Sequence, residues 1–187
     1  MISNAPWLKK FVAARRLALR GDVEGLHDVR TSARRLRVWL RLAGLRVLED
    51  DLRWLCQETS ALRDLDVFAA VLTEDARAVL RPLAESRAHA ALKSKRIDGV
   101  VFALQTLGGC AEDDARRVLT KLERSLPRAK PRRKLNGDAL HRFRRKIRRV
   151  RYAREWLGLG ASEHERAQEV LGAVCDVLAL ERLVVGE

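Results

Sequence analysis

The stretch 27-HDVRTSARRLRVWLRL-42 combines an apolar helical face with a line of basic side chains. At about 100° per residue, its leucines, valines and alanines, spaced three and four residues apart, fall on one side of an α-helix. The basic side chains fall within an adjacent arc of roughly 80°. This set, the first stripe, consists of His27, Arg30, Arg34, Arg37 and Arg41. A helix with this pattern buries its apolar face in a core and keeps the stripe at the border of that core.

The same pattern returns in 141-HRFRRKIRRVRYAREW-156, and both copies read HxxRxxxRRxR. The second stripe consists of His141, Arg144, Arg148 and Arg151. Glu155 takes the place that Arg41 has in the first stripe. A weaker echo links 57-QETSALRDLD-66 to 168-QEVLGAVCD-176. Because the period is too long for a solenoid, we interpret the repeat as duplication of a helical half, which gives two bundles related by an approximate two-fold axis.

Leucine, alanine, arginine and glutamate dominate the intervals between the few prolines and glycines, and this is the composition of helices rather than strands. The sequence therefore predicts an all-α fold. The predicted helices cover approximately residues 6–19, 23–45, 49–72, 82–96, 100–107, 113–126, 138–156 and 163–183. Asn4, Asp22 and Asp138 are predicted N-caps, Gly21 a C-cap and Pro82 the start of a helix. Glu49, with the two aspartates that follow it, supplies negative charge suited to a helix N-terminus.

The 187 residues are predicted to form one compact domain, since 47% hydrophobic and 34% charged residues suffice for a real core. The repeat divides this domain into a first half of about residues 1–125 and a second half of about 138–187. Residues 126–137, rich in lysine, arginine and proline, are predicted to be an exposed connector.

The chain carries 38 lysines and arginines against 25 acidic residues, a formal net charge of +13. This excess is far beyond what solubility requires, and it predicts a polyanionic partner. Cys56, Cys110 and Cys175 lie far apart without a CxxC spacing, which argues against a disulfide framework or a zinc site. With neither a signal peptide nor a membrane-spanning segment in the sequence, we expect a cytoplasmic protein that does not bind membranes.

A line of arginines one turn apart destabilises a helix by a few tenths of a kcal/mol per pair, so its presence needs an explanation. Guanidinium groups are planar, permanently charged and able to bind phosphate oxygens with two donors. From Arg30 to Arg41 the first stripe spans roughly 16 Å at the rise of an α-helix, which suits several consecutive phosphates. For a single stripe, intramolecular salt bridges or a solvated face are the favoured explanation. Two stripes in one register, with 13 uncompensated charges, favour binding of a polyanion.

These residues resemble the CHAD family, the conserved-histidine α-helical domain. HDVRTSARRLRVWLRL resembles the first signature of the family and 140-LHRFRRKIRRVRYAREWLG-158 the second, and weaker similarity extends over nearly the whole chain. The resemblance implies two helical bundles related by a pseudo-two-fold axis and a basic central cleft that binds inorganic polyphosphate. It also implies association with polyphosphate granules. The chain differs from the family in being short after Tyr152, and the ExExK signature of the triphosphate-processing domain fused to some members does not occur here.

The resemblance also implies which residues bind polyphosphate. The predicted binding residues are His27, Arg30, Arg34, Arg35, Arg37, His141, Arg144, Arg148, Arg149 and Arg151, with Arg41 and Arg145 as extensions. Each histidine is equally well explained as a structural residue. Neither histidine has a metal-ligating partner at local spacing, and Asp64 and Asp66 are better explained by pairing with arginines than by cation binding, so no metal or cofactor is predicted.

Nucleic acid is the second candidate partner, because counterion release rewards any basic surface. An aromatic content of 5% leaves few side chains for base stacking, which argues against single-strand recognition. No phosphate-binding loop, nucleophile elbow or paired catalytic carboxylates occur, so we do not expect an enzyme. Phosphate transfer through a phosphorylated His27 or His141 remains a third, less favoured alternative. The sequence predicts no particular oligomeric state.

Overall fold

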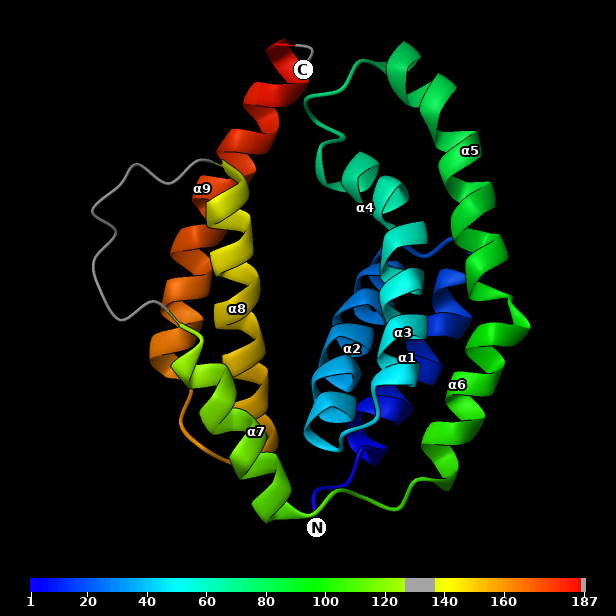
Figure 1. Ribbon diagram of the computed structural model, residues 1–187. Coiled ribbons are helices and arrows are strands. Elements are labelled where there is room, and N and C mark those ends of the chain that lie inside the picture. Colours follow the sequence, from blue (N-terminus) through cyan, green and yellow to red (C-terminus); the bar gives the residue numbers. More distant parts are fainter. Residues whose placement is uncertain (127–136, 186–187) are drawn as a thin grey trace. The chain divides into compact units, whose positions relative to one another are not determined.

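The structure is a computed structural model that describes residues 1–126 and 137–185, without the side chains of 176 and 178–185. The predicted connector, 126–137, lies almost entirely outside the described residues. The described chain forms helices throughout, which confirms the all-α prediction, and it contains no strand longer than an isolated bridge between Ile2 and Cys110. The helices are α1 Ala5–Ala18, α2 Val23–Leu42, α3 Arg46–Glu58, α4 Ser60–Val67, α5 Glu74–Leu92, α6 Lys95–Thr106, α7 Glu112–Arg124, α8 Gly137–Trp156 and α9 Ser162–Val185 (Figure 1).

The chain divides into two compact units, residues 1–110 with α1 to α6 and residues 111–187 with α7 to α9. The repeat had grouped residues 113–126 with the first half, whereas α7 packs against α8 in the structure and belongs to the second unit. Each unit therefore contains one stripe helix, α2 or α8, packed against the helix that follows it. No helix within the described ranges is both long and apolar enough to span a membrane.

The core of the first unit is built around α2. Trp39, Leu36 and Val29 of this helix are completely buried, together with Phe11 of α1 and Leu52 of α3. Trp39 also donates a hydrogen bond of 2.9 Å from Nε1 to the carbonyl of Ile2. This packing fixes the rotation of α2 about its axis, and the stripe next to its apolar face is fixed with it.

The junction of α1 and α2 follows the predicted capping in part. Gly21 has a φ of +83°, a conformation that favours glycine, and the side chain of Asp22 accepts a hydrogen bond from the amide of Gly25. A Cβ on Gly25 would lie 2.7 Å from the Cβ of Leu17, so this glycine permits the close approach of the two helices. The predicted N-cap Asp22 is confirmed, whereas the C-cap of α1 is Leu19, and Gly21 follows it by two residues.

Four other local predictions differ from the structure. Asn4 occupies the N-cap position of α1, as predicted, but its side chain makes no capping bond, because the buried amide donates instead to the carbonyl of Leu104 at 2.9 Å. Pro82 lies inside α5, which begins at Glu74 with Thr73 as its cap. The single helix expected over 49–72 is two helices, α3 and α4, which meet at the buried Thr59. The start of α8 at Gly137 also precedes the predicted cap, Asp138.

The core of the second unit lies between α8 and α9. Ile147, Val150 and Ala153 form the buried face of α8, and Cys175 is buried on α9. Leu119 and Ala115 are the buried positions of α7. The arrangement leaves the stripe of α8 beside its apolar face, as in α2.

Candidate functional site

The first stripe lies along α2 where that helix meets α3 and α4. Arg30 is buried, with 7% of its surface exposed, and the other four members are half-buried. The stripe therefore borders the core, as the helical spacing predicts. This position is unusual for charged groups, because burial without a partner is costly.

Arg30 joins α2 to the end of α3. Its Nη1 donates to the carbonyl of Cys56 at 2.6 Å and to the hydroxyl of Thr59 at 2.9 Å. Burial, and to a lesser extent the positive charge of Arg34, lowers the pKa of Arg30 from its ordinary value. These contacts give Arg30 a structural role, and its role in ligand binding stays a prediction.

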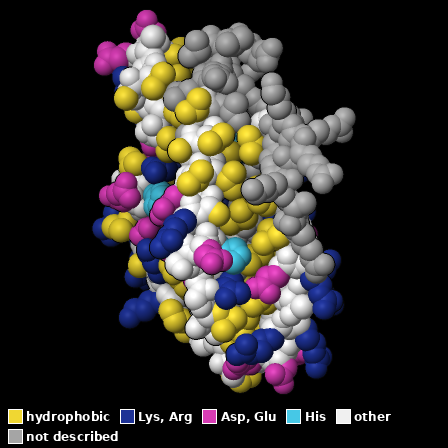
Figure 2. All heavy atoms as spheres, turned by 90° about the vertical axis from the view of Figure 1, so that its left-hand side faces the viewer, with side chains coloured by type: hydrophobic (Ala, Val, Ile, Leu, Met, Phe, Trp, Pro, Cys, Tyr) yellow, Lys and Arg dark blue, Asp and Glu magenta, His cyan; other side chains and the backbone are white. Residues whose placement is uncertain are grey.

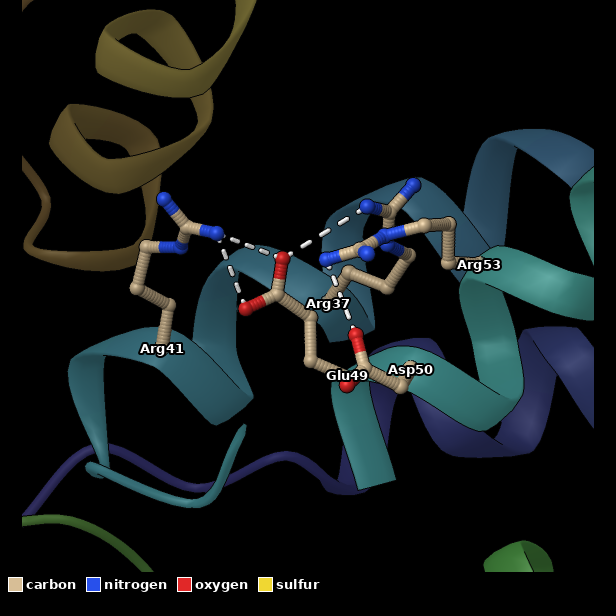
Figure 3. A network of polar contacts seen from close by, with 5 residues as sticks. All are labelled: Arg37, Arg41, Glu49, Asp50 and Arg53. Carbon is tan, nitrogen blue, oxygen red and sulfur yellow. Dashed lines mark hydrogen bonds and ion pairs between the residues drawn. The ribbon is translucent and has the colours of Figure 1, made fainter. Parts of the chain in front are cut away.

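Glu49 of α3 holds the last two arginines of the first stripe (Figure 3). Arg41 donates from Nη2 to both carboxylate oxygens of Glu49, at 2.6 and 2.9 Å, and Nη2 of Arg37 lies 3.5 Å from one of them. The Glu49 side chain is only 5% exposed. Nearby, Arg53 pairs with Asp50 at 2.9 Å. Burial lowers the pKa of Arg37 from its ordinary value, while the Glu49 carboxylate acts in the opposite direction.

Arg34 occupies the middle of the first stripe. Within the described residues it makes no hydrogen bond or ion pair, and its charged neighbours are Arg30 and Asp64. Desolvation raises the pKa of the Asp64 carboxyl, and Arg30, Arg34 and Arg63 act against that shift. Arg34 is thus the stripe arginine whose donors are most available to a ligand.

The remaining candidates on α2 make local contacts. Arg35 stacks over the ring of Trp7 on α1, with its guanidinium carbon 4.2 Å from the ring centroid. Nε2 of His27 lies 3.4 Å from the hydroxyl of Thr31, one turn along the same helix. Arg35 consequently belongs to the side of α2 that faces α1.

Two arginines that the sequence analysis did not predict add to the positive charge of the first stripe. Arg53 of α3 lies close enough to influence the ionisation of Arg37, and Arg63 of α4 that of Arg30. Their helices bring them to the stripe from 12 or more residues away in sequence, so no periodicity within α2 could reveal them. The first cluster is defined as the arginines of the first stripe with these two additions: Arg30, Arg34, Arg37, Arg41, Arg53 and Arg63.

The second stripe repeats part of this arrangement on α8. Arg151 donates from Nε to Glu155 at 2.7 Å and pairs through Nη2 with Glu165 of α9. Arg144 packs against Gly172 of α9, where a Cβ would lie 3.0 Å from its Nη2. Further members and neighbours of the stripe are half-buried or exposed: His141, Arg148 and Arg149 are half-buried and Arg145 is exposed.

The structure places the predicted residues of each stripe on one helix face, in each unit separately. On the side of the second unit seen in Figure 2, lysines and arginines lie beside acidic and apolar side chains. Among the described side chains visible on this side, the charge is therefore mixed rather than uniformly positive. The described part of the chain contains no group of three histidine, cysteine or acidic side chains that could hold a metal ion. The shared cleft implied by the family resemblance stays a prediction.

Comparisons with known proteins agree on the fold. The family profile described as "CHAD domain" matches residues 5–184. The crystal structure of the CHAD domain from the plant Ricinus communis superposes with a TM-score of 0.71 at 24% identity, covering 98% of this chain and 75% of the other. PptA from Streptomyces chartreusis has a TM-score of 0.55 at 21% identity, with 91% and 78% covered. Among curated proteins, none matches this chain.

Proposed function

Because the chain belongs to the CHAD domain family, we propose that it binds inorganic polyphosphate through the arginines of its two stripes. The observation that carries the proposal is the first cluster, in which six guanidinium groups lie near three carboxylates of the described residues, those of Glu49, Asp50 and Asp64. Arginines at the border of a core, with a surplus of positive charge, form a site for an anion with many charges.

The chemistry of the ligand follows from the spacing of these donors. Arg34, Arg37 and Arg41 recur at each turn of α2, about 5 Å apart along the axis. A flexible chain of phosphates offers oxygens at every link and can therefore follow such a line. The proposal includes the shared basic cleft that the family resemblance implies, a binding rather than a catalytic role, and association with polyphosphate granules.

Protection of Cys56 tests this proposal at the first cluster. Cys56 is half-buried at the end of α3, and its carbonyl accepts the hydrogen bond of Arg30, whereas Cys110 and Cys175 are buried. Long-chain polyphosphate at ten times its Kd should slow alkylation of Cys56 by an uncharged thiol reagent about tenfold, because only free protein reacts. The rate is measured by mass spectrometry of the modified peptide.

Orthophosphate at the same total phosphate concentration provides the control and should leave the rate unchanged. An unaltered rate at Cys56 under conditions where the protein demonstrably binds polyphosphate would place the ligand elsewhere on the chain.

A further inference from the structure

A carboxylate occupies the same end of both stripes. Glu49 is the fourth residue of α3 and Glu165 the fourth residue of α9, and each of these helices directly follows a stripe helix. Glu49 contacts Arg37, and Glu165 contacts Arg151, which is the equivalent of Arg37 in the repeat. The same pairing has thus been built in both units, although the surrounding residues differ.

The two stripes differ in the number of carboxylates and arginines that meet at this end. At the end of the first stripe one carboxylate, Glu49, meets Arg37 and Arg41, which leaves one positive charge. At the end of the second stripe two carboxylates, those of Glu155 and Glu165, pair with the single guanidinium of Arg151. Arg34, in the middle of the first stripe, has no such carboxylate at bonding distance among the described residues.

These carboxylates use the same donors that a phosphate would use. Nη2 of Arg41 donates to both oxygens of Glu49, and a charged guanidinium N–H binds phosphate oxygens in the same way. A phosphate chain that extends from Arg34 toward Arg41 therefore meets guanidinium groups already bonded to an anion. It must either displace the carboxylate or bind beside a negative charge, and both reduce affinity.

We infer that Glu49 and Glu165 are internal competitors that weaken anion binding at the ends of the stripes and thereby restrict tight binding to densely charged phosphate chains. This inference rests on the proposed function. An anion of lower charge density gains too little from the paired arginines to offset the carboxylates, whereas long-chain polyphosphate binds through the whole line. Such selectivity by built-in repulsion is a general device of specific interfaces.

The test compares two variants that remove one negative charge each. Glu49→Gln alters a carboxylate that is 5% exposed and lies 2.6 Å from a stripe arginine. Asp66→Asn alters a carboxylate that is also 5% exposed and lies 2.8 Å from Arg81 of α5, which is not a stripe residue. The two substitutions therefore match in burial, in the loss of an arginine contact and in net charge. They differ in whether the arginine partners belong to a stripe, and Glu49 has two such partners where Asp66 has one.

We expect Glu49→Gln to bind labelled long-chain polyphosphate roughly tenfold more tightly than the unaltered protein, and Asp66→Asn to stay within about twofold. The slope of log affinity against log salt should steepen by about one for each arginine released from Glu49. A merely structural role of Glu49 would not steepen this slope. The ratio of the affinity for polyphosphate to the affinity for duplex DNA should decrease in the Glu49 variant and stay unchanged in the Asp66 variant.

Two results would overturn the inference: a Glu49 variant that binds no more tightly than the Asp66 variant, or one with an unchanged salt slope. If circular dichroism shows that the Glu49→Gln variant does not fold, the Glu165→Gln variant provides the test. The Glu165 side chain is 47% exposed, so its replacement should be tolerated. It should tighten binding by about threefold. Absence of binding by the unaltered protein, measured in the same titration, would instead reject the proposed function itself.

Discussion

Reversing Arg34 and Arg148 together to glutamate is expected to weaken binding of long-chain polyphosphate by at least about a hundredfold while leaving the helical content unchanged. Arg34 lies in the middle of the first cluster without a hydrogen-bonded partner in the described chain, and Arg148 is its equivalent on α8. Each reversal replaces an attraction to the phosphate chain with a repulsion. Binding is measured by fluorescence anisotropy and helical content by circular dichroism.

The matched control reverses Arg16 and Arg117, exposed residues of α1 and α7 that lie outside both stripes. Both double variants lower the net charge of +13 by four, two for each substitution. A general loss of charge would weaken both equally. If the stripe variant retains the affinity of the control, the stripes are not the binding surface.

Replacing Arg30 with methionine is expected to lower the free energy of unfolding by about 2–4 kcal/mol. The substitution keeps the apolar stem but removes the donor to the Cys56 carbonyl and the Thr59 hydroxyl, which would leave a polar group at the end of α3 without its bond. The free energy of unfolding is measured by urea denaturation. In contrast, Arg34→Met should cost less than about 0.5 kcal/mol, because Arg34 makes no comparable contact within the described residues.

A loss below about 0.5 kcal/mol for Arg30→Met would contradict the structural role assigned to Arg30. The comparison also distinguishes an arginine with a structural role from one that is available for ligand binding. Arg30 connects helices inside the unit, whereas Arg34 has the donors that a ligand can use.

Local chemistry explains which parts of the fold were predictable from sequence. Gly21 and Asp22 end one helix and begin the next through backbone conformation and one side-chain bond, so neighbouring residues suffice to predict them. The helical period likewise placed the first stripe at the border of the core. Membership of the CHAD domain family, expected from the two motifs, is confirmed by the match over residues 5–184.

Tertiary contacts and competing caps explain the local predictions that differ from the structure. Asn4 donates to Leu104, a hundred residues away, instead of capping its own helix. Pro82 was expected to begin a helix because it lacks an amide proton, yet the Thr73 cap starts α5 earlier and the exposed proline is tolerated inside it. The buried Thr59, bonded to Arg30, marks a break between α3 and α4 that sequence propensity does not reveal.

The candidate site was predictable only for the residues of the stripe helices. Glu49 was interpreted as a helix N-terminal charge, whereas in the structure it pairs with two stripe arginines. Glu165, Arg53 and Arg63 were not singled out at all. Each reaches its partner from a following helix, and a pattern along one helix contains no information about its neighbours.

A competition titration measures whether the two stripes select polyphosphate over other polyanions. Labelled long-chain polyphosphate is displaced from the full chain by unlabelled polyphosphate, duplex DNA or single-stranded DNA, matched for total charge, at near-physiological salt where non-specific binding weakens. We expect polyphosphate to displace the label efficiently and both forms of DNA to need at least about tenfold higher concentrations. Equal displacement by DNA would contradict this expectation, because the stripes would then be a general cationic surface.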